Sequence, residues 1–291
     1  MRPMGKEMKP KKPFRRNGKP APQTKAKTIS DVRPSEEVRL NRYLAQAGVA
    51  SRRAADDIIL DRRVRVNGAV VDALGTRIKP NDQVFVDGKL VSPGRLDYIL
   101  LNKPGDTITT VSDERGRKTV LDLLELSEEE RAGLYPVGRL DRHTQGLLLI
   151  TNDGDLAHHL MHPKYGVTKV YRVVTDKVIP DEHLSLLLSG ITLDDGIARA
   201  DKVAAAEPYD GTSIAVSIHE GRNHIVRRMF AALGYEDIKL ERVSYGPLNL
   251  KGVRRGKWRR LHPHEIAKLY RLVKLKPGRP SAPEKPLRSR K

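Results

Sequence analysis

A single aspartate, Asp141, is the residue whose surroundings most favour chemistry. It lies between Arg139 and Arg142 in the string GRLDRHTQGLLLITNDGD, residues 138–155. The run LLLI is typical of a buried strand, and the TNDG that follows has the composition of a turn and helix start. A carboxylate held on such a frame can act as a nucleophile or as a base. The plain alternative is a turn residue that pairs with a neighbouring arginine.

A second string, EGRNHIVRRMF at residues 220–230, supplies cations that could serve such a carboxylate. A carboxyl group in a cleft tends to keep its proton because desolvation raises its pKa, so a paired cation is needed to hold it ionised. Arg227 and Arg228 are the candidates. Successive helical residues face different directions, so we expect only one of them to reach the aspartate. The alternative is an ordinary basic helix.

Two further groups of residues could take part in a site. Tyr171, in the string KVYRV, offers an aromatic face for stacking and a phenolic oxygen, although a core tyrosine is the plain alternative. His158, His159 and His162 have spacings that could share a helix face and bind a metal ion. The chain has no cysteine and this helix is short, so we expect structural or RNA-facing histidines and no metal site.

The region from residue 97 to 274 is predicted to be a domain that positions these residues. Its strands and helices are interspersed without a regular parallel alternation, which favours an α+β fold with a mixed, mainly antiparallel sheet and flanking helices. The expected strands are Tyr98–Leu101 (ending at residues 102–105), Leu147–Ile150, Lys169–Val174, Ser213–His219 and Ile238–Val243, and the expected helices are Pro180–Leu188 and His224–Leu233.

Residues 38–96 are predicted to form a smaller module of two helices and two hairpins. The first helix spans Arg39–Ala47, and Ser51 is placed to cap the second helix, with Ile58 and Ile59 facing inward. The dipeptides Asn-Gly at 67–68 and Asp-Gly at 87–88 each separate two short apolar runs, which is a strong hairpin signal.

The net charge of +19 lies mainly in the two ends of this 291-residue chain. Residues 1–28 carry +9 and residues 275–291 carry +5, so only +5 remains for the body between them. We predict basic disordered tails at 1–37 and 275–291 that attract phosphates in a salt-sensitive way, or that act only as solubilising segments. The absence of cysteine and of a membrane-length apolar run favours the cytoplasm.

The strings occur in an order that resembles the RNA pseudouridine synthases, in the branch that modifies ribosomal RNA. The similarity includes GRLD, KVY, EGRNHIVRRMF and the LMHP at residues 160–163. The segment LNRYLAQAGVASRRAADDIILDRRVRVNG resembles the S4 domain, a small RNA-binding fold. The long basic ends lie outside this similarity.

The resemblance implies roles for particular residues. Asp141 would be the catalytic aspartate, Arg227 its paired cation, Tyr171 the ring that stacks on the uracil and helps to move a proton, and Val226 an apolar wall of the uracil pocket. Lys103 and Pro104 match a motif that shapes the cleft. We expect Lys103, Arg139 and Asn223 to contact the substrate. The residues expected to bind RNA through the S4 module are Arg52, Arg53, Arg62, Arg63 and Arg65.

The implied reaction converts uridine to pseudouridine by breaking the bond between N1 and C1′, turning the base and rejoining it through C5. No redox change is involved, and we expect neither cofactor nor metal. The predicted substrate is ribosomal RNA or a pre-ribosomal particle, most closely that of the large subunit, acted on by a monomer. The alternatives are a small-subunit synthase and a non-catalytic S4-domain assembly factor that binds ribosomal precursors. Whether the aspartate attacks C1′, attacks the uracil or removes a sugar proton stays open.

Overall fold

The computed structural model describes residues 37–276. The two predicted basic tails lie outside this range apart from a few residues at their inner ends. One of these, Leu275, was predicted to start the C-terminal tail, yet it is partly buried against the hydrophobic core that includes Tyr270. Among the described residues, no helix is both long and apolar enough to cross a membrane.

The N-terminal module has the predicted two helices and two hairpins. Its elements are β1 (Val38–Arg39), α1 (Leu40–Gln46), α2 (Arg52–Leu60), β2 (Val64–Val66), β3 (Ala69–Val71), β4 (Arg77–Ile78), β5 (Val84–Val86) and β6 (Lys89–Val91). The Ser51 side chain caps α2 by accepting a hydrogen bond from the Ala54 amide, 3.2 Å away. Ile59 is fully buried and Ile58 packs at the edge of the same core.

The two hairpin turns owe their shape to residues that tolerate positive φ. Asn67 and Gly68 have φ values of 50° and 85°, and Asp87 and Gly88 have 48° and 77°. This pattern matches the right-handed twist of the flanking strands. The hairpins pair through β2 and β5 into a four-stranded sheet of order β3-β2-β5-β6. The short pair β1–β4, which the sequence did not predict, adds a second small sheet.

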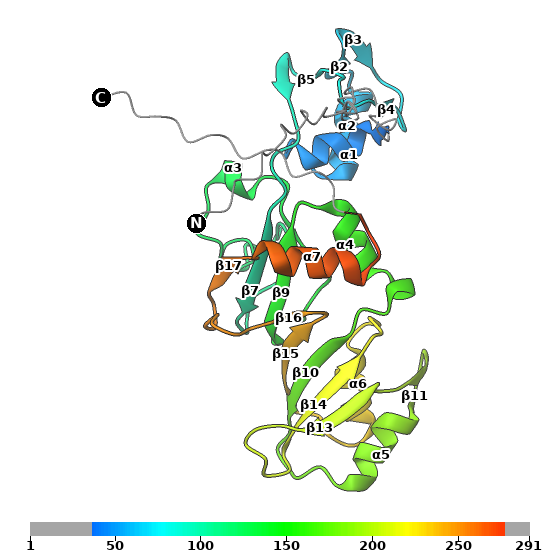
Figure 1. The fold of residues 1–291 in the computed structure, drawn as a ribbon, viewed down its shortest axis with the longest axis vertical. Coiled ribbons are helices and arrows are strands. Elements are labelled where there is room, and N and C mark those ends of the chain that lie inside the picture. Colours follow the sequence, from blue (N-terminus) through cyan, green and yellow to red (C-terminus); the bar gives the residue numbers. More distant parts are fainter. Residues whose placement is uncertain (1–36, 277–291) are drawn as a thin grey trace, which may run out of the picture. The chain divides into compact units, whose positions relative to one another are not determined.

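The C-terminal domain is built on one large sheet with helices and loops on its faces (Figure 1). Its elements are β7 (Tyr98–Lys103), α3 (Glu128–Arg131), β8 (Tyr135–Pro136), β9 (Gln145–Thr151), α4 (Gly154–Met161), the 3-10 helix η1 (Pro163–Tyr165), β10 (Lys169–Val174), α5 (Asp181–Ser189), β11 (Ile191–Leu193), β12 (Gly196–Ala198), β13 (Lys202–Ala205), β14 (Ser213–Ile218), α6 (Ile225–Ala232), β15 (Lys239–Tyr245), β16 (Leu248–Asn249), β17 (Trp258–Arg260) and α7 (Pro263–Leu272).

The nine-stranded sheet is mixed, as predicted. Its main order is β13-β14-β10-β15-β9-β7-β17, with β16 beside β15 and β8 beside β9. The pairing of β9 with β15 is parallel, whereas the other strand pairs of this sheet are antiparallel. Two strands that are far apart in the sequence therefore meet at the centre of the sheet.

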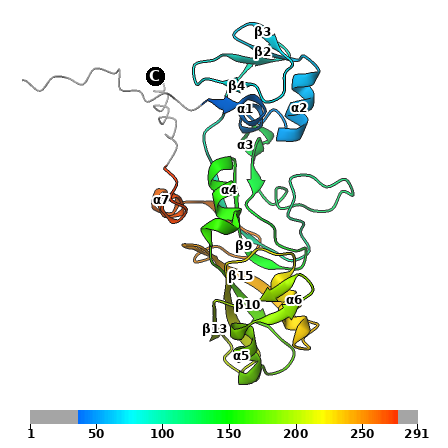
Figure 2. The ribbon, with the colours of Figure 1, turned by 90° about the vertical axis from the view of Figure 1, so that its right-hand side faces the viewer.

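Different parts of the chain cover the two faces of the sheet. Helices α4 and α7 pack on one face of β7 and β9, where Leu147 and Leu149 are fully buried. On the other face Leu148 and Ile150 pack against loop residues such as Val120 and Leu124. Helices α5 and α6 cover the half of the sheet formed by β10, β14 and β15, as Figure 2 shows from the side.

A buried polar network attaches α7 to the sheet. The hydroxyl of Tyr98 donates to Asp153 at 2.8 Å, and the hydroxyl of Tyr270 on α7 also donates to this carboxylate. Asp153 in turn caps α4 by accepting from the Leu156 amide. Because a buried carboxylate needs hydrogen-bond donors, the two tyrosines and the helix start stabilise one another.

Candidate active site

Asp141 lies in a tight loop immediately before β9, on the wall of a pocket of about 690 Å³. The loop closes through a hydrogen bond from the Thr144 amide to the Asp141 carbonyl at 3.1 Å. Its other side is held by Thr109, whose hydroxyl donates to the Leu140 carbonyl at 2.7 Å and accepts from the Leu140 amide at 3.3 Å. The main chain that carries the carboxylate is therefore fixed at both ends.

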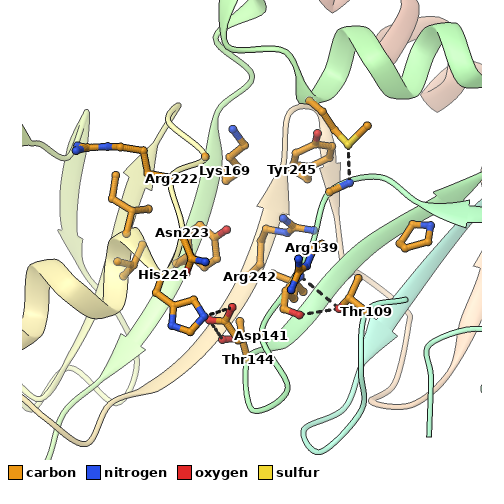
Figure 3. Close-up of a pocket in the computed structure, with 18 of the residues that line it drawn as sticks. Thr109, Arg139, Asp141, Thr144, Lys169, Arg222, Asn223, His224, Arg242 and Tyr245 are labelled. Atoms are coloured by element: carbon orange, nitrogen blue, oxygen red, sulfur yellow. Dashed lines mark hydrogen bonds and ion pairs between the residues drawn. The ribbon is translucent and has the colours of Figure 1, made fainter. Parts of the chain in front are cut away.

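The carboxylate itself has a partner on each oxygen (Figure 3). One oxygen, Oδ1, lies 3.2 Å from Nε2 of His224. The other, Oδ2, lies 3.6 Å from Nε of Arg227 and accepts a hydrogen bond from the Thr144 hydroxyl at 3.3 Å. The Asp141 side chain keeps 32% of its surface exposed, so a ligand in the pocket can reach it. A guanidinium, an imidazole and a hydroxyl therefore contact this carboxylate.

Lys103 does not contact the pocket, contrary to the prediction that it binds substrate. It is the last residue of β7 and has no exposed surface. The nitrogen of its ammonium group lies 2.8–3.1 Å from four backbone carbonyl oxygens, those of Pro104, Asp141, Arg142 and Thr144, which share its three N–H donors. The strand was predicted to end at Leu101, but it continues through Asn102 and Lys103. Lys103 therefore fixes the main chain of the loop that contains Asp141.

If Asp141 reacts with an RNA substrate, as the resemblance implies, replacing Lys103 by methionine is expected to slow this reaction about 10- to 100-fold while RNA binding is retained, since the loop that carries Asp141 loses its common donor. Single-turnover rates, compared with equilibrium RNA binding, measure the two effects separately. Equal losses in both would show that Lys103 acts on the whole fold or on RNA binding instead.

The pH dependence of stability gives a second test of Lys103. Burial lowers the pKa of its amine from 10.5 to about 8, against the opposing effect of Asp141. Between these two values the unfolded chain binds more protons than the folded chain, so the contribution of Lys103 makes the free energy of unfolding rise with pH. The difference in this free energy between wild type and Lys103→Met should therefore increase from about pH 8 to about pH 10. A difference that stays flat would contradict the lowered pKa of Lys103 in the folded chain.

The floor of the pocket is made by β10 and β15. Tyr171 lies opposite Arg242, and Lys169 lies opposite Tyr245, with a register shift between them. Lys169 and Tyr171 are two residues apart and share one face of β10, whereas Arg242 and Tyr245 are three apart. The bulge brings both β15 side chains to the same face, a common use of bulges beside active sites. All four side chains line the pocket that contains Asp141.

Helix α6 and the residues before it supply the part of the wall beside Asp141. The helix begins after His224, whose φ is 47°, and carries Val226 and Arg227 into the pocket. Val226 is buried, and Asn223 in the preceding loop is an exposed part of the lining. Arg228 points to another partner and pairs with Asp195. Only one of the two adjacent arginines reaches Asp141, as the geometry of a helix predicts.

Several residues of the pocket were not singled out from the sequence. His224 stands inside the string EGRNHIVRRMF, and its place at the start of the predicted helix His224–Leu233 was the available signal. The helix begins one residue later, at Ile225. Thr144 follows Asp141 by three residues, a spacing typical of a side chain that closes a turn. Lys169 and Arg242 could not be found in this way because their position depends on the pairing of distant strands. Arg139, which was predicted to contact substrate, lines the pocket.

The arginines of the N-terminal module differ in their partners. Arg52 and Arg53 are exposed on the first turn of α2, and no ion pair joins either to an acidic residue within 37–276. Arg63 forms a two-point pair with Asp87 at 2.9 and 2.6 Å. Arg62 lies 3.6 Å from Asp72, and Arg65 donates to the Gly68 carbonyl.

Comparison with known proteins places this chain in a family. The chain is 44% identical over 238 residues to "Ribosomal large subunit pseudouridine synthase B" of Bacillus subtilis, an alignment that covers 81% of this chain and 96% of the relative. The chain belongs to the RNA pseudouridine synthases. It is also 43% identical to an "Uncharacterized RNA pseudouridine synthase" of Aquifex aeolicus, over 82% of this chain and 96% of that protein.

Two domain families match separate parts of this pseudouridine synthase. Residues 97–232 match the RNA pseudouridylate synthase family and residues 38–84 match the S4 domain. A solved structure described as "Crystal structure of pseudouridylate synthase" superposes with a TM-score of 0.56 at 27% identity, covering 80% of this chain and 99% of that one. The protein is therefore an isomerase with an RNA-binding domain, and the predicted α+β fold is confirmed.

Proposed function

We propose that this pseudouridine synthase converts one uridine of large-subunit ribosomal RNA to pseudouridine, with Asp141 as the reacting carboxylate. The observation that carries the proposal is the pairing of Asp141 with Arg227 and His224 at the wall of a pocket whose floor includes Tyr171. The 44% identical relative named for the large subunit supports the substrate.

Each pocket residue has a proposed part in the reaction. A uridine inside a duplex cannot reach a recessed carboxylate, so it must leave its stack and enter the pocket. Tyr171 then supplies a face for the uracil ring and an oxygen for proton movement, while Val226 packs against the ring. Arg227 and His224 hold the Asp141 carboxylate in position as the bond between N1 and C1′ breaks. Arg139 and Asn223 contact the nucleotide from the rim.

Mapping of pseudouridine in total ribosomal RNA tests this function. Cells that lack the protein should lose the modification at one large-subunit position, and wild type should restore it while Asp141→Asn should not. A lost site in small-subunit RNA would overturn the substrate, and an unchanged map would overturn the function.

We also propose that the enzyme acts as a cytoplasmic monomer on free or pre-ribosomal RNA.

Arg52 and Arg53 are the proposed phosphate contacts of the S4 domain. Changing both to glutamine should make the slope of log affinity against log salt concentration less negative by about 2, because about two fewer counterions are released on binding. The matched control is Arg62 and Arg63 changed together. These already face Asp72 and Asp87, so their loss should change the slope less. A larger change in the control would reverse the assignment.

A further inference from the structure

Three cations of the pocket have no acidic partner among the described residues. Of its lining carboxylates, Asp141 pairs with Arg227 and His224, and Glu220 pairs with Arg222 at 2.8 Å. No ion pair within residues 37–276 joins Arg139, Lys169 or Arg242 to a carboxylate. This part of the pocket therefore carries uncompensated positive charge, which favours an anionic ligand.

The guanidinium of Arg242 is the most confined of the three. Only 3% of the residue is exposed, its Nε donates to the Leu147 carbonyl at 2.8 Å, and its plane lies over the ring of Tyr245. Its Nη2 atom is buried and has no hydrogen-bond partner. A buried charged group without an opposite charge is costly. The cost falls if a ligand in the adjoining pocket brings a negative charge close to it.

Lys169 has the free donor that such a ligand needs. Its ammonium group donates to the carbonyls of His219 at 2.7 Å and Glu220 at 3.4 Å, which leaves the third N–H. Burial and the neighbouring Arg242 lower the pKa of Lys169 to about 8. Asp201 opposes this shift, but that carboxylate lies outside the lining and is bound to His219 at 2.6 Å. Figure 3 shows Lys169 beside Tyr245, across the pocket from Asp141.

We propose that Lys169 and Arg242 form a phosphate site that holds the sugar-phosphate backbone of the flipped uridine. Lys169 donates to a phosphate oxygen, and the buried Arg242 raises the positive potential from the floor. The site rests on the proposed function, since a nucleotide is the ligand that brings its own anion. Tyr171 lies on the same strand face as Lys169 and opposite Arg242, so base and backbone are held by neighbouring side chains.

Single-turnover kinetics with altered RNA tests the contact. The substrate is the fragment that contains the mapped uridine, with a neutral methylphosphonate in place of the phosphate on its 5′ or its 3′ side. At one of these positions wild type should lose kcat/KM about tenfold or more. Lys169→Met should show this loss with unmodified RNA and little further loss with the neutral linkage. The control Lys202→Met removes an exposed lysine of the outer strand β13 and should respond like wild type. The proposal would be overturned if the neutral linkage reduced kcat/KM of Lys169→Met by the same factor as it reduces that of wild type.

A labelling experiment separates this site from the proposed function. The Lys169 amine of the wild-type chain is acetylated at pH 8 and quantified by mass spectrometry, in the presence of uridine 5′-monophosphate or of uridine. The nucleotide should slow labelling several-fold more than the nucleoside does. Equal protection, or none, would overturn the phosphate site. If no RNA is modified but the nucleotide still protects Lys169, the proposed function fails and the anion site stands.

Discussion

Asp141→Asn is expected to abolish pseudouridine formation while RNA binding stays within about twofold of wild type. Asparagine has the same shape and can still accept from the Thr144 hydroxyl, but it lacks the negative charge needed to attack carbon or remove a proton. A fall in the single-turnover rate of about a thousandfold or more is the expected size for loss of a reacting group. His224 and Arg227 would then face a neutral amide.

The matched control for Asp141 is a carboxylate near the same loop that does not line the pocket. Asp106 pairs with Arg142 at 2.5 Å and is 70% exposed. Asp106→Asn should keep nearly full activity because an exposed ion pair contributes little. Turnover by Asp141→Asn within tenfold of wild type would show that this carboxylate is not the reacting group, whatever the control does.

The two oxygens of the Asp141 carboxylate have different partners, and His224 contacts one of them. Arg227 and Thr144 contact Oδ2, whereas the imidazole of His224 contacts Oδ1. The imidazole reaches it because His224 adopts a positive φ directly before α6. One loop-to-helix junction therefore places both side chains that pair with Asp141, one directly before the helix and one on its first turn.

Local patterns in the sequence predicted most elements because periodicity and turn dipeptides depend only on residues that are close together in the chain. The strand Lys169–Val174 agrees at both ends, and the Asn-Gly and Asp-Gly hairpins turn where expected. Helix α7 was missed although its start carries usable signals, with Pro263 at the first position and Glu265 in a capping box with His262. Strand β17 was missed because its three residues, Trp258–Arg260, are too few to show a period.

Within each string the residue types indicated candidate site residues, but they did not show which strings meet in the fold. Asp141 and Arg227 lie in separate strings, and the resemblance to a known family joined them. Lys103 was misplaced because a lysine at the end of an apolar strand is normally at the surface. Its burial depends on four carbonyls, three of which lie about 40 residues further along the chain. Such non-local contacts leave no periodic trace in the sequence.

Gly146→Ala is expected to be the most damaging single change to stability. Gly146 lies where β9 meets β15 in parallel, opposite Arg242, with φ of 102°. An added Cβ would lie 2.3 Å from the Arg242 carbonyl oxygen and 2.8 Å from its amide nitrogen, both main-chain atoms that cannot move aside. The free energy of unfolding should fall by about 3 kcal/mol or more, a loss of roughly 6 to 12 °C in Tm.

Gly116 offers the control that separates the cost of a positive φ from the cost of a clash between the new Cβ and a neighbouring main chain. Its φ is also positive, at 64°, but an added Cβ would meet nothing within 4 Å. Gly116→Ala should therefore cost only about 1 kcal/mol, from backbone strain alone. Thermal unfolding of both variants measures the difference, and equal losses would refute the proposed clash at the strand pair. Because the same pair carries Arg242 and leads directly into the Asp141 loop, Gly146→Ala should also lose activity under conditions where it remains folded.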